Sequence, residues 1–318
     1  MIIYIEKDAL NYTQTNKIIS LFPEATKIII KNYKNIFDKN IPLHQEKCIV
    51  IAKITGSAIG KTPDNYGHTP NTYFFKTSIN CVFDCSYCYL KGAFKNDMQV
   101  YFVNYDEIKK DISEVIEKDK NPMRFYSSDY SDILGSNKIS GFLQEFVPFF
   151  EKFDNVMMEV RTKSTCIQDI IDLGFVPKNT EFAFSLNPQI LIDKYEKGTP
   201  CLDDRIKAIN KLLEQGYKVG LRFLPLLPVK NYEQIYTEFV EYIKKNIDIK
   251  KLHSSFAAGL LYTKEDYNKI LKKYPRLDIL HKLKLEKDDF VRCDREERDF
   301  FYKIFKDLDK NCKICMDE

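Results

Sequence analysis

The sequence predicts an α/β fold built around a parallel sheet. Strand-like and helix-like segments alternate along the middle of the chain, and 318 residues are enough to bury a large core. Strict alternation favours parallel strands joined by right-handed helical crossovers. We expect this sheet in residues 71–260, between a small N-terminal lobe of residues 1–70 and a helical C-terminal extension of residues 261–318.

Short β-branched and aromatic runs mark the strands of this sheet. The six strand candidates are Thr72–Thr77, Met123–Ser127, Val156–Arg161, Glu181–Leu186, Lys218–Leu224 and Lys251–Phe256. Helical patterns lie between them at Asp106–Lys118, Ser140–Phe153, Thr165–Leu173, Leu202–Gln215 and Tyr232–Lys245. The segment Leu202–Gln215 is a clear case, because its apolar residues recur at helical spacing.

The N-terminal lobe carries its own strand and helix signals. Met1–Glu6 and Cys48–Ile54 are apolar and β-branched, as strands are, and Thr13–Leu21 has the pattern of a short helix. The loop Gly56–Pro70 follows, with three glycines and two prolines, and its His68 is expected at the surface.

Composition narrows the class of protein. The net charge is +3, from 49 basic and 46 acidic residues, so nucleic-acid binding would require a local basic patch. No apolar run approaches the roughly 18 residues that span a bilayer, and the first residues lack the pattern of a secretory signal. Nine cysteines without an export signal indicate reduced thiols and metal binding, so we expect a cytoplasmic protein without membrane contact.

Three cysteines follow the first strand of the predicted sheet. Cys81, Cys85 and Cys88 are spaced x3 and then x2. Thiolates are the ligands of iron–sulfur clusters, and three of them leave one iron of a [4Fe–4S] cluster open to another ligand. A zinc site is the alternative, but zinc sites usually take four protein ligands in paired spacings, and no second pair lies nearby.

The motif, with Tyr87 just before the third cysteine, resembles the radical S-adenosylmethionine (radical SAM) superfamily. The resemblance implies a partial (β/α)6 barrel and a [4Fe–4S] cluster whose open iron binds S-adenosylmethionine (SAM). It also implies that reduction cleaves SAM to a 5′-deoxyadenosyl radical, which abstracts a hydrogen atom from the substrate. The difficult chemistry then belongs to the cofactor.

Further motifs, in order and at conserved spacing, are similar to those of the spore photoproduct lyase family. They are Ile5–Tyr12, Cys85–Leu90, Val100–Asn104, Ser131–Gly135, Arg161–Lys163, Phe184–Asn187, Glu196–Thr199 with Asp204–Arg205, and Gly216–Gly220. That family reverses a UV cross-link between adjacent thymines in spore DNA. The resemblance implies that Cys81, Cys85 and Cys88 hold the cluster, that Tyr87 packs by the SAM adenine, and that Lys163 and Ser185 contact SAM. Lys163 and Ser185 lie at the ends of the third and fourth predicted strands, where barrel active sites gather.

One departure from the family concerns the hydrogen donor. The family places a cysteine after the second strand, where it returns a hydrogen atom to the thymine radical; this sequence has Asp129 there. A carboxylate has no such atom to give, so Asp129 binds a cation, accepts a proton, orients a polar substrate or caps the following helix. The replacement donors that we consider are Cys166 and the tyrosines Tyr89, Tyr126 and Tyr130.

A second departure lies in the C-terminal extension, whose helical patterns are Lys264–Lys273 and Glu296–Leu308. The family's lyases carry a basic, aromatic, glycine-containing hairpin that opens the lesion, whereas Leu283–Arg292 has charges of both signs and no glycine. DNA contact would then depend on other basic side chains, the alternative being an ordinary solvated face. These are Lys250, Lys251, Lys272, Lys273, Arg276, Lys282 and Lys284.

Three cysteines of the extension suggest a second metal site. Cys312 and Cys315 form a C-x2-C pair, and Cys293 lies upstream. Such a set can bind an auxiliary iron–sulfur cluster or zinc, and ordinary tail thiols are the alternative.

Three functions are consistent with these patterns. The first is a radical SAM lyase that repairs thymine-dimer lesions in DNA, with flavodoxin or ferredoxin as electron donor. The second is the same radical chemistry on a peptide, nucleoside or small molecule, which Asp129 and the altered extension favour. The third is a non-catalytic iron–sulfur protein that senses redox state or binds nucleic acid; the presence of Lys163 and Ser185 beside the cluster motif argues against it.

Overall fold

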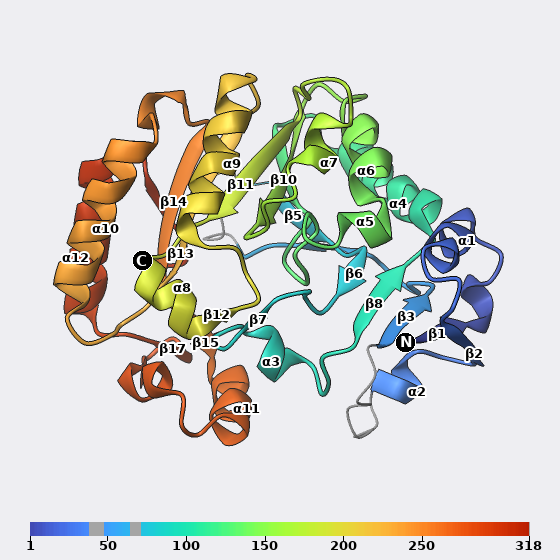
Figure 1. Cartoon of the computed structure of the whole chain (residues 1–318), viewed down its shortest axis with the longest axis horizontal. Helices are drawn as coiled ribbons and strands as arrows, with labels where there is room; N and C mark the ends of the chain where they lie inside the picture. Colours follow the sequence, from blue (N-terminus) through green and yellow to red (C-terminus); the bar gives the residue numbers. More distant parts are fainter. Residues whose placement is uncertain (38–47, 64–70, 318) are drawn as a thin grey trace.

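The computed structural model describes residues 1–37, 48–63 and 71–317, so His68 lies outside the described residues. Two main sheets contain most of the described strands. Figure 1 shows the N-terminal sheet at the right and the larger, curled sheet at the centre and left. A two-stranded and a three-stranded sheet complete the described strands.

The larger sheet is the predicted partial barrel. Its parallel strands run in chain order as β5 (Thr72–Phe75), β9 (Met123–Tyr126), β10 (Val156–Thr162), β11 (Thr180–Ser185), β13 (Val219–Leu226) and β14 (Ser254–Gly259). The prediction of a six-stranded parallel core is therefore confirmed. Two edge strands extend it to eight: β4 (Ile59–Lys61) pairs antiparallel with β5, and β18 (Lys313–Ile314) pairs parallel with β14.

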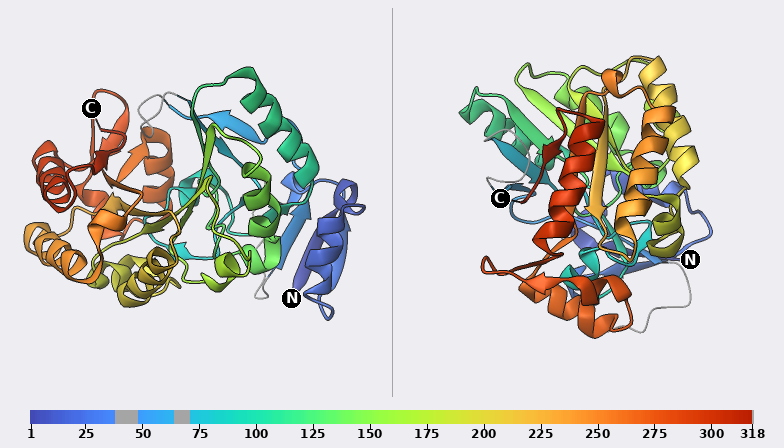
Figure 2. Two further views of the ribbon diagram at one scale, coloured as in Figure 1. Left: turned by 90° about the horizontal axis from the view of Figure 1, so that it is seen from above. Right: turned by 90° about the vertical axis from the view of Figure 1, so that its left-hand side faces the viewer.

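Helices cover the outer face of the curled sheet (Figure 2). They are α4 (Tyr105–Lys118), α5 (Asn137–Ser140), α6 (Phe142–Phe150), α7 (Gln168–Ile171), α8 (Gln189–Tyr195), α9 (Leu202–Glu214), α10 (Tyr232–Asn246) and α12 (Arg295–Leu308). The helix expected over Ser140–Phe153 is divided, because Gly141 adopts φ 60° and ends α5 before α6 begins. The helix expected over Thr165–Leu173 is only α7, and α8 was not predicted. None of the helices in the described part of the chain is long and apolar enough to cross a membrane.

The N-terminal sheet takes strands from both sides of residue 70. Its order is β2 (Thr26–Ile30), β1 (Ile2–Glu6), β3 (Cys48–Ala52), β8 (Gln99–Phe102) and β6 (Ser78–Ile79). It carries α1 (Thr13–Ser20) and α2 (Lys34–Phe37). Because β6 and β8 belong here while β4 belongs to the barrel, the two sheets are interleaved in sequence around residue 70.

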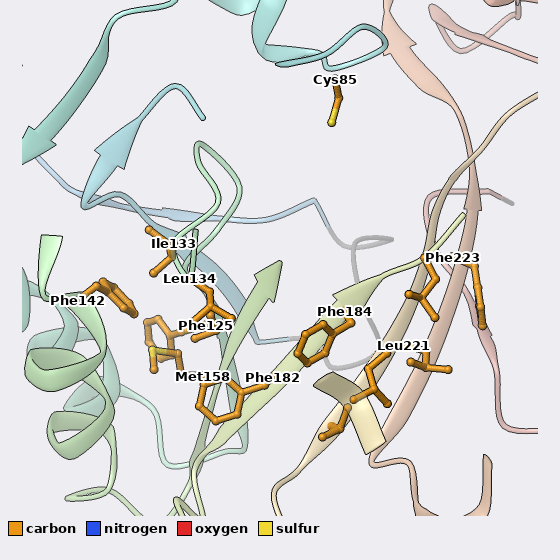
Figure 3. Close-up of a cluster of buried hydrophobic side chains, with 14 of the residues drawn as sticks. Cys85, Phe125, Ile133, Leu134, Phe142, Met158, Phe182, Phe184, Leu221 and Phe223 are labelled. Atoms are coloured by element: carbon orange, nitrogen blue, oxygen red, sulfur yellow. The ribbon is translucent and has the colours of Figure 1, made fainter. Parts of the chain in front are cut away.

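An aromatic core joins the barrel sheet to its helices. Phe75 and Phe125 from the strands meet Phe142, Phe146 and Phe150 from α6, and the Phe142 and Phe146 rings stack with centroids 4.6 Å apart. Figure 3 shows outward-facing side chains of the later strands continuing this layer. Burial of such large apolar side chains is the main stabilising term for the fold.

The inner face of the barrel, in contrast, is charged. Arg222 on β13 donates two hydrogen bonds to Glu159 on β10, at 3.1 and 2.7 Å, and Arg124 on β9 lies 2.5 Å from Glu181 on β11. Both glutamates and Arg222 have fully buried side chains, so each charge requires a partner. Gly220 leaves the space that they occupy, because a Cβ there would lie 2.3 Å from Glu181 Oε1. This ion network lies inside the barrel and extends toward the amino ends of β9 and β11, where Arg124 and Glu181 stand second in their strands.

The C-terminal extension is mixed rather than only helical. α11 (Lys264–Lys273) and α12 match the predicted helices, and the Thr263 hydroxyl caps α11 by accepting the Asp266 N–H at 3.1 Å. A three-stranded antiparallel sheet was not predicted. It contains β15 (Leu261–Thr263), β16 (Lys284–Leu285) and β17 (Phe290–Arg292).

Candidate active site

A cavity of about 450 Å³ opens at the carboxyl ends of the barrel strands. Arg161, Lys163, Ser185, Leu224 and Gly259 contribute to its wall from the ends of four strands or just beyond them. The segment with the cysteine motif, the loop after β9 and the last described residues of the extension also line it. A volume of this size suits a small-molecule ligand.

The three motif cysteines line this cavity from a loop between β6 and β8. The Asn80 amide closes the base of the loop by donating to the carbonyls of Asn96 at 2.9 Å and Met98 at 2.8 Å. A turn then folds the C-x2-C segment, since the Cys88 N–H donates to the Cys85 carbonyl at 3.1 Å. Figure 3 shows Cys85 pointing from this loop toward the barrel.

A buried carboxylate anchors the cysteine loop to the barrel. Glu196 accepts hydrogen bonds from the Tyr87 hydroxyl, from Asn187 Nδ2 at 2.9 Å and from Arg205 Nη2 at 2.6 Å. The strand β12 (Glu196–Lys197) also pairs with β7 (Asp84–Cys85), and Arg205 Nη1 donates to the Ser185 carbonyl at 2.9 Å. Glu196 and Arg205 stood in matched motifs, but no role was predicted for either. Together they position Tyr87, Cys85 and Ser185.

Lys163 carries its positive charge beside the cysteine loop. Its ammonium lies 5.8 Å from the centroid of the Tyr87 ring. Burial alone would lower the pKa of Lys163, but the negative charges of Glu196 and Cys85 outweigh it, so the pKa is raised. Asp132 holds the end of β10 in place by accepting hydrogen bonds from the Lys163 N–H and the Thr162 hydroxyl, both at 2.7 Å.

The donor set fits a positively charged metal cluster. Burial raises the pKa of all three motif thiols, that of Cys85 to about 12, and the neighbouring thiols add to the effect for Cys81 and Cys85. The positive charge of Lys163 partly offsets this rise in pKa for Cys85 and Cys88. Three thiolates that line one cavity, with Cys85 buried and Cys81 and Cys88 partly buried, are therefore unfavourable by themselves, and a cationic iron–sulfur core would stabilise them.

The structure brings Asp129 and Tyr89 together and leaves Cys166 apart. Asp129, Tyr89 and Tyr130 all line the cavity, and the Tyr89 hydroxyl donates to the Asp129 carbonyl. Neither Cys166 nor Tyr126 belongs to the described lining of the cavity. Cys166 is half-buried just before α7, where its N–H donates to the Ser164 hydroxyl at 3.1 Å.

The three cysteines of the extension are not gathered into one site. Cys293 is fully buried, and Cys312 is 1% exposed within the hydrophobic core. Only Cys315 of the three lines the cavity. Among residues 1–37, 48–63 and 71–317, no three His, Cys, Asp or Glu side chains already stand close enough to hold a metal. The motif cysteines at least open onto one cavity, whereas the tail cysteines do not, so the predicted second metal site finds no support.

The segment Leu283–Arg292 does form a hairpin, although it lacks glycine. β16 and β17 pair across a turn in which Asp289 adopts φ 64°, the left-handed conformation that glycine usually takes. Its tip is charged, and Arg292 bonds to Asp288 within it. The basic side chains are divided: Lys250 and Lys251 precede β14, at the end of the barrel opposite the cavity, whereas the others lie in or near α11 and β16.

A family model described as spore photoproduct lyase matches residues 1–305. The chain belongs to the spore photoproduct lyase family. The spore photoproduct lyase of Clostridium acetobutylicum is 29% identical over 215 residues, 67% of this chain and 61% of that protein. The enzyme of the same name from Bacillus subtilis is 27% identical over 301 residues, 92% of this chain and 85% of that protein. The matched region thus spans less than two thirds of the Clostridium relative.

The fold is also that of solved structures with this name. A doubly substituted spore photoproduct lyase with bound AdoMet and dinucleoside spore photoproduct superposes with a TM-score of 0.82. Identity is 21%, and the superposition covers 98% of this chain and 97% of the other. The similarity to these structures confirms the predicted partial-barrel fold of this chain.

Proposed function

We propose that this chain is a radical SAM lyase that repairs the thymine cross-link of UV-damaged spore DNA. The observation that carries the proposal is one cavity at the carboxyl ends of the barrel strands, lined by the three motif cysteines, Lys163 and Ser185. The family match over residues 1–305 supports the substrate class. When bound, a [4Fe–4S] cluster and SAM supply the carbon radical that abstracts a hydrogen atom from the lesion.

Each part of the cavity wall has a role in this proposal. Cys81, Cys85 and Cys88 hold the cluster, and Lys163 offsets the negative charge of the thiolates and of the SAM carboxylate. Ser185 offers a hydroxyl to SAM, and the apolar wall near Leu224 gives its adenine a surface that excludes water. Tyr87, held by Glu196, packs beside this ligand.

Two partners follow from the chemistry. One-electron reduction of the cluster requires a low-potential donor, for which we propose flavodoxin or ferredoxin. DNA would approach the cavity past the hairpin of β16 and β17, where Lys282 and Lys284 lie nearest among the basic side chains considered above. Because the hairpin tip is charged in both signs, it neutralises fewer phosphates than a basic wedge would, so we expect weaker and less salt-dependent binding of duplex DNA.

A second candidate function is radical chemistry on a substrate other than DNA. Asp129, which stands where the family has its hydrogen-donor cysteine, favours it. In that case the carboxylate of Asp129 orients a polar or cationic group of the substrate, since it lines the same cavity.

The deciding experiment uses anaerobically reconstituted, dithionite-reduced protein with SAM and an oligonucleotide that contains the spore-type thymine dimer. Mass spectrometry follows 5′-deoxyadenosine and restored thymine. Restored thymine is the expected result. Deoxyadenosine without restored thymine would favour the second candidate, and a full cluster with neither product would favour a non-catalytic iron–sulfur protein.

A further inference from the structure

The last residues of the described chain are held inside the barrel opening. β18 pairs with β14 so that Ile314 lies opposite Ala257, and the Cys315 N–H donates to the Ala257 carbonyl at 3.0 Å. On the other side of Cys315, the Asp317 carboxylate accepts from Arg298 Nε at 2.9 Å and Arg292 Nη1 at 3.3 Å. The Asp317 side chain is 3% exposed, so this ion cluster is a buried clamp. Cys315 is thus fixed from both sides.

The clamped segment presents Cys315 to the active-site cavity. Cys315 lines it together with Met316, Gly259 and Leu261. Met316 adopts φ 59°, which is uncommon for a residue with a side chain and turns the backbone directly after the cysteine. In the described part of the chain, Cys315 is the one cavity-lining thiol outside the Cys81–Cys88 motif.

The cavity offers few other sources of a hydrogen atom. The motif thiols are required as cluster ligands, and the carboxylate of Asp129 has none to give. The phenols of Tyr87 and Tyr262 are engaged, because Tyr87 donates to Glu196 and Tyr262 donates to the Tyr87 carbonyl at 2.6 Å. Tyr89 donates to the Asp129 carbonyl, and Tyr130 is the remaining phenol of the described cavity lining. A thiol S–H bond is weaker than the C–H bond that forms when it meets an alkyl radical, so a thiol is well suited to this step.

We propose that Cys315 is the hydrogen-atom donor of this active site, an inference that rests on the proposed lyase function. Its S–H bond breaks, and the hydrogen atom forms a C–H bond at the substrate carbon left as a radical by cleavage of the cross-link. The product is closed-shell thymine and a thiyl radical on Cys315. One electron from the flavodoxin or ferredoxin donor and one proton from water restore the thiol.

The first test needs no cofactor. Anaerobic apoprotein is treated with iodoacetamide, and mass spectrometry compares the alkylation rates of Cys315 and Cys312. Because Cys315 lines the cavity and Cys312 is buried in the core, Cys315 should react at least about 10-fold faster. Equal rates would overturn the inference, because they would mean that Cys315 does not face the cavity.

The second test uses the reconstituted enzyme and two variants, Cys315→Ala and Cys315→Ser. The serine variant keeps the shape and polarity of the site, but its O–H bond is too strong to break. Both variants should still form 5′-deoxyadenosine, while restored thymine per deoxyadenosine falls about 10-fold or more, on the scale of losing one catalytic group. The matched control is Cys201→Ala, a half-buried cysteine beside α9 and outside the cavity lining, which should behave as wild type.

Deuterium labelling shows whether the donated atom comes from an exchangeable group, and comparison with Cys315→Ser assigns that group. Wild-type protein exchanged into D₂O carries an S–D thiol, so restored thymine should contain one deuterium. An unchanged yield or label in Cys315→Ser, or loss of deoxyadenosine together with thymine in both variants, would overturn the role of Cys315 alone. Absence of restored thymine from the wild-type enzyme would instead overturn the proposed function and the inference with it.

Discussion

The chain contains two C-x2-C pairs, and the structure uses them in opposite ways. Cys85 and Cys88 lie in a turn closed by a 3.1 Å backbone hydrogen bond, so both thiols face one cavity. Between Cys312 and Cys315 the chain is the extended strand β18, in which successive side chains alternate between faces. Positions three apart then point to opposite sides: Cys312 enters the core and Cys315 the cavity. The C-x2-C spacing therefore directs two thiols to one site only where the backbone between them turns.

The largest expected effect comes from breaking the pair in the turn. Cys88→Ala removes a cluster ligand, so we expect iron per chain after reconstitution to fall to background and deoxyadenosine formation to be lost. Iron and sulfide analysis measures this. Cys312→Ala is the matched control, and it should retain the wild-type iron content. An equal loss of iron in both variants would contradict the distinction between the pairs.

The next effect concerns the carboxylate that anchors the turn. Glu196 and Arg205 have fully buried side chains. Glu196→Gln should therefore lower the free energy of unfolding of the apoprotein by about 3–5 kcal/mol, because it leaves Arg205 without its counter-charge. Urea unfolding followed by circular dichroism gives this value. A loss below 1 kcal/mol would show that the pair does not anchor the loop.

The stabilisation by Glu196 should also depend on pH. Burial alone would raise the pKa of Glu196, but Lys163 and Arg205 outweigh it, and the pKa is lowered. The stabilisation from Glu196 is therefore complete above the usual glutamate pKa near 4.3 and is lost as the pH falls below it. The free energy of unfolding of wild-type apoprotein should drop more steeply between pH 5 and pH 3 than that of Glu196→Gln. Parallel curves would exclude this contribution.

A smaller effect is expected for the clamp that holds the extended pair. Asp317→Asn weakens the hydrogen bonds from Arg292 and Arg298, so we expect a loss of about 1.5–3 kcal/mol in unfolding free energy. The tail should also loosen, so that alkylation of Cys315 becomes faster in the variant than in wild type. Unchanged alkylation would mean that β18 holds the tail without the clamp.

The smallest loss of stability is expected at the contact between the C-terminal extension and the cysteine loop. Tyr262→Phe removes only the hydrogen bond to the Tyr87 carbonyl, which is worth about 0.5–1.5 kcal/mol. Iron content should remain at the wild-type level, whereas thermal unfolding should begin a few degrees lower. Loss of the cluster in this variant would show that the extension, and not Glu196, determines the position of the cysteine loop.

The features that local sequence encodes were predictable. The strands of the barrel follow from patterns of a few residues, and the places of Lys163 and Ser185 near strand ends follow from these strands and from the resemblance to the family. Glu196 was present in a matched motif, but its role depends on Tyr87, which is 109 residues away. The same holds for Cys315: β18 has two residues, too few for a periodicity, and its place depends on pairing with β14. Gly141 was the available signal for the divided helix, and it was overlooked.

The interleaving of the two sheets makes the N-terminal lobe a structural part of the catalytic loop. The loop leaves β6 at Ile79 and returns at Gln99 in β8, and these neighbouring strands belong to the N-terminal sheet, where β3 supports β8. Both ends of the segment that carries the cysteines are thus anchored in the N-terminal sheet. A chain shortened to begin at residue 71 would keep every strand of the parallel core. It would lose β3, however, which pairs with β8 and so supports both ends of the cysteine loop. The N-terminal lobe therefore contributes to the stability of the cysteine loop, and we expect the lobe and the barrel to fold as one unit.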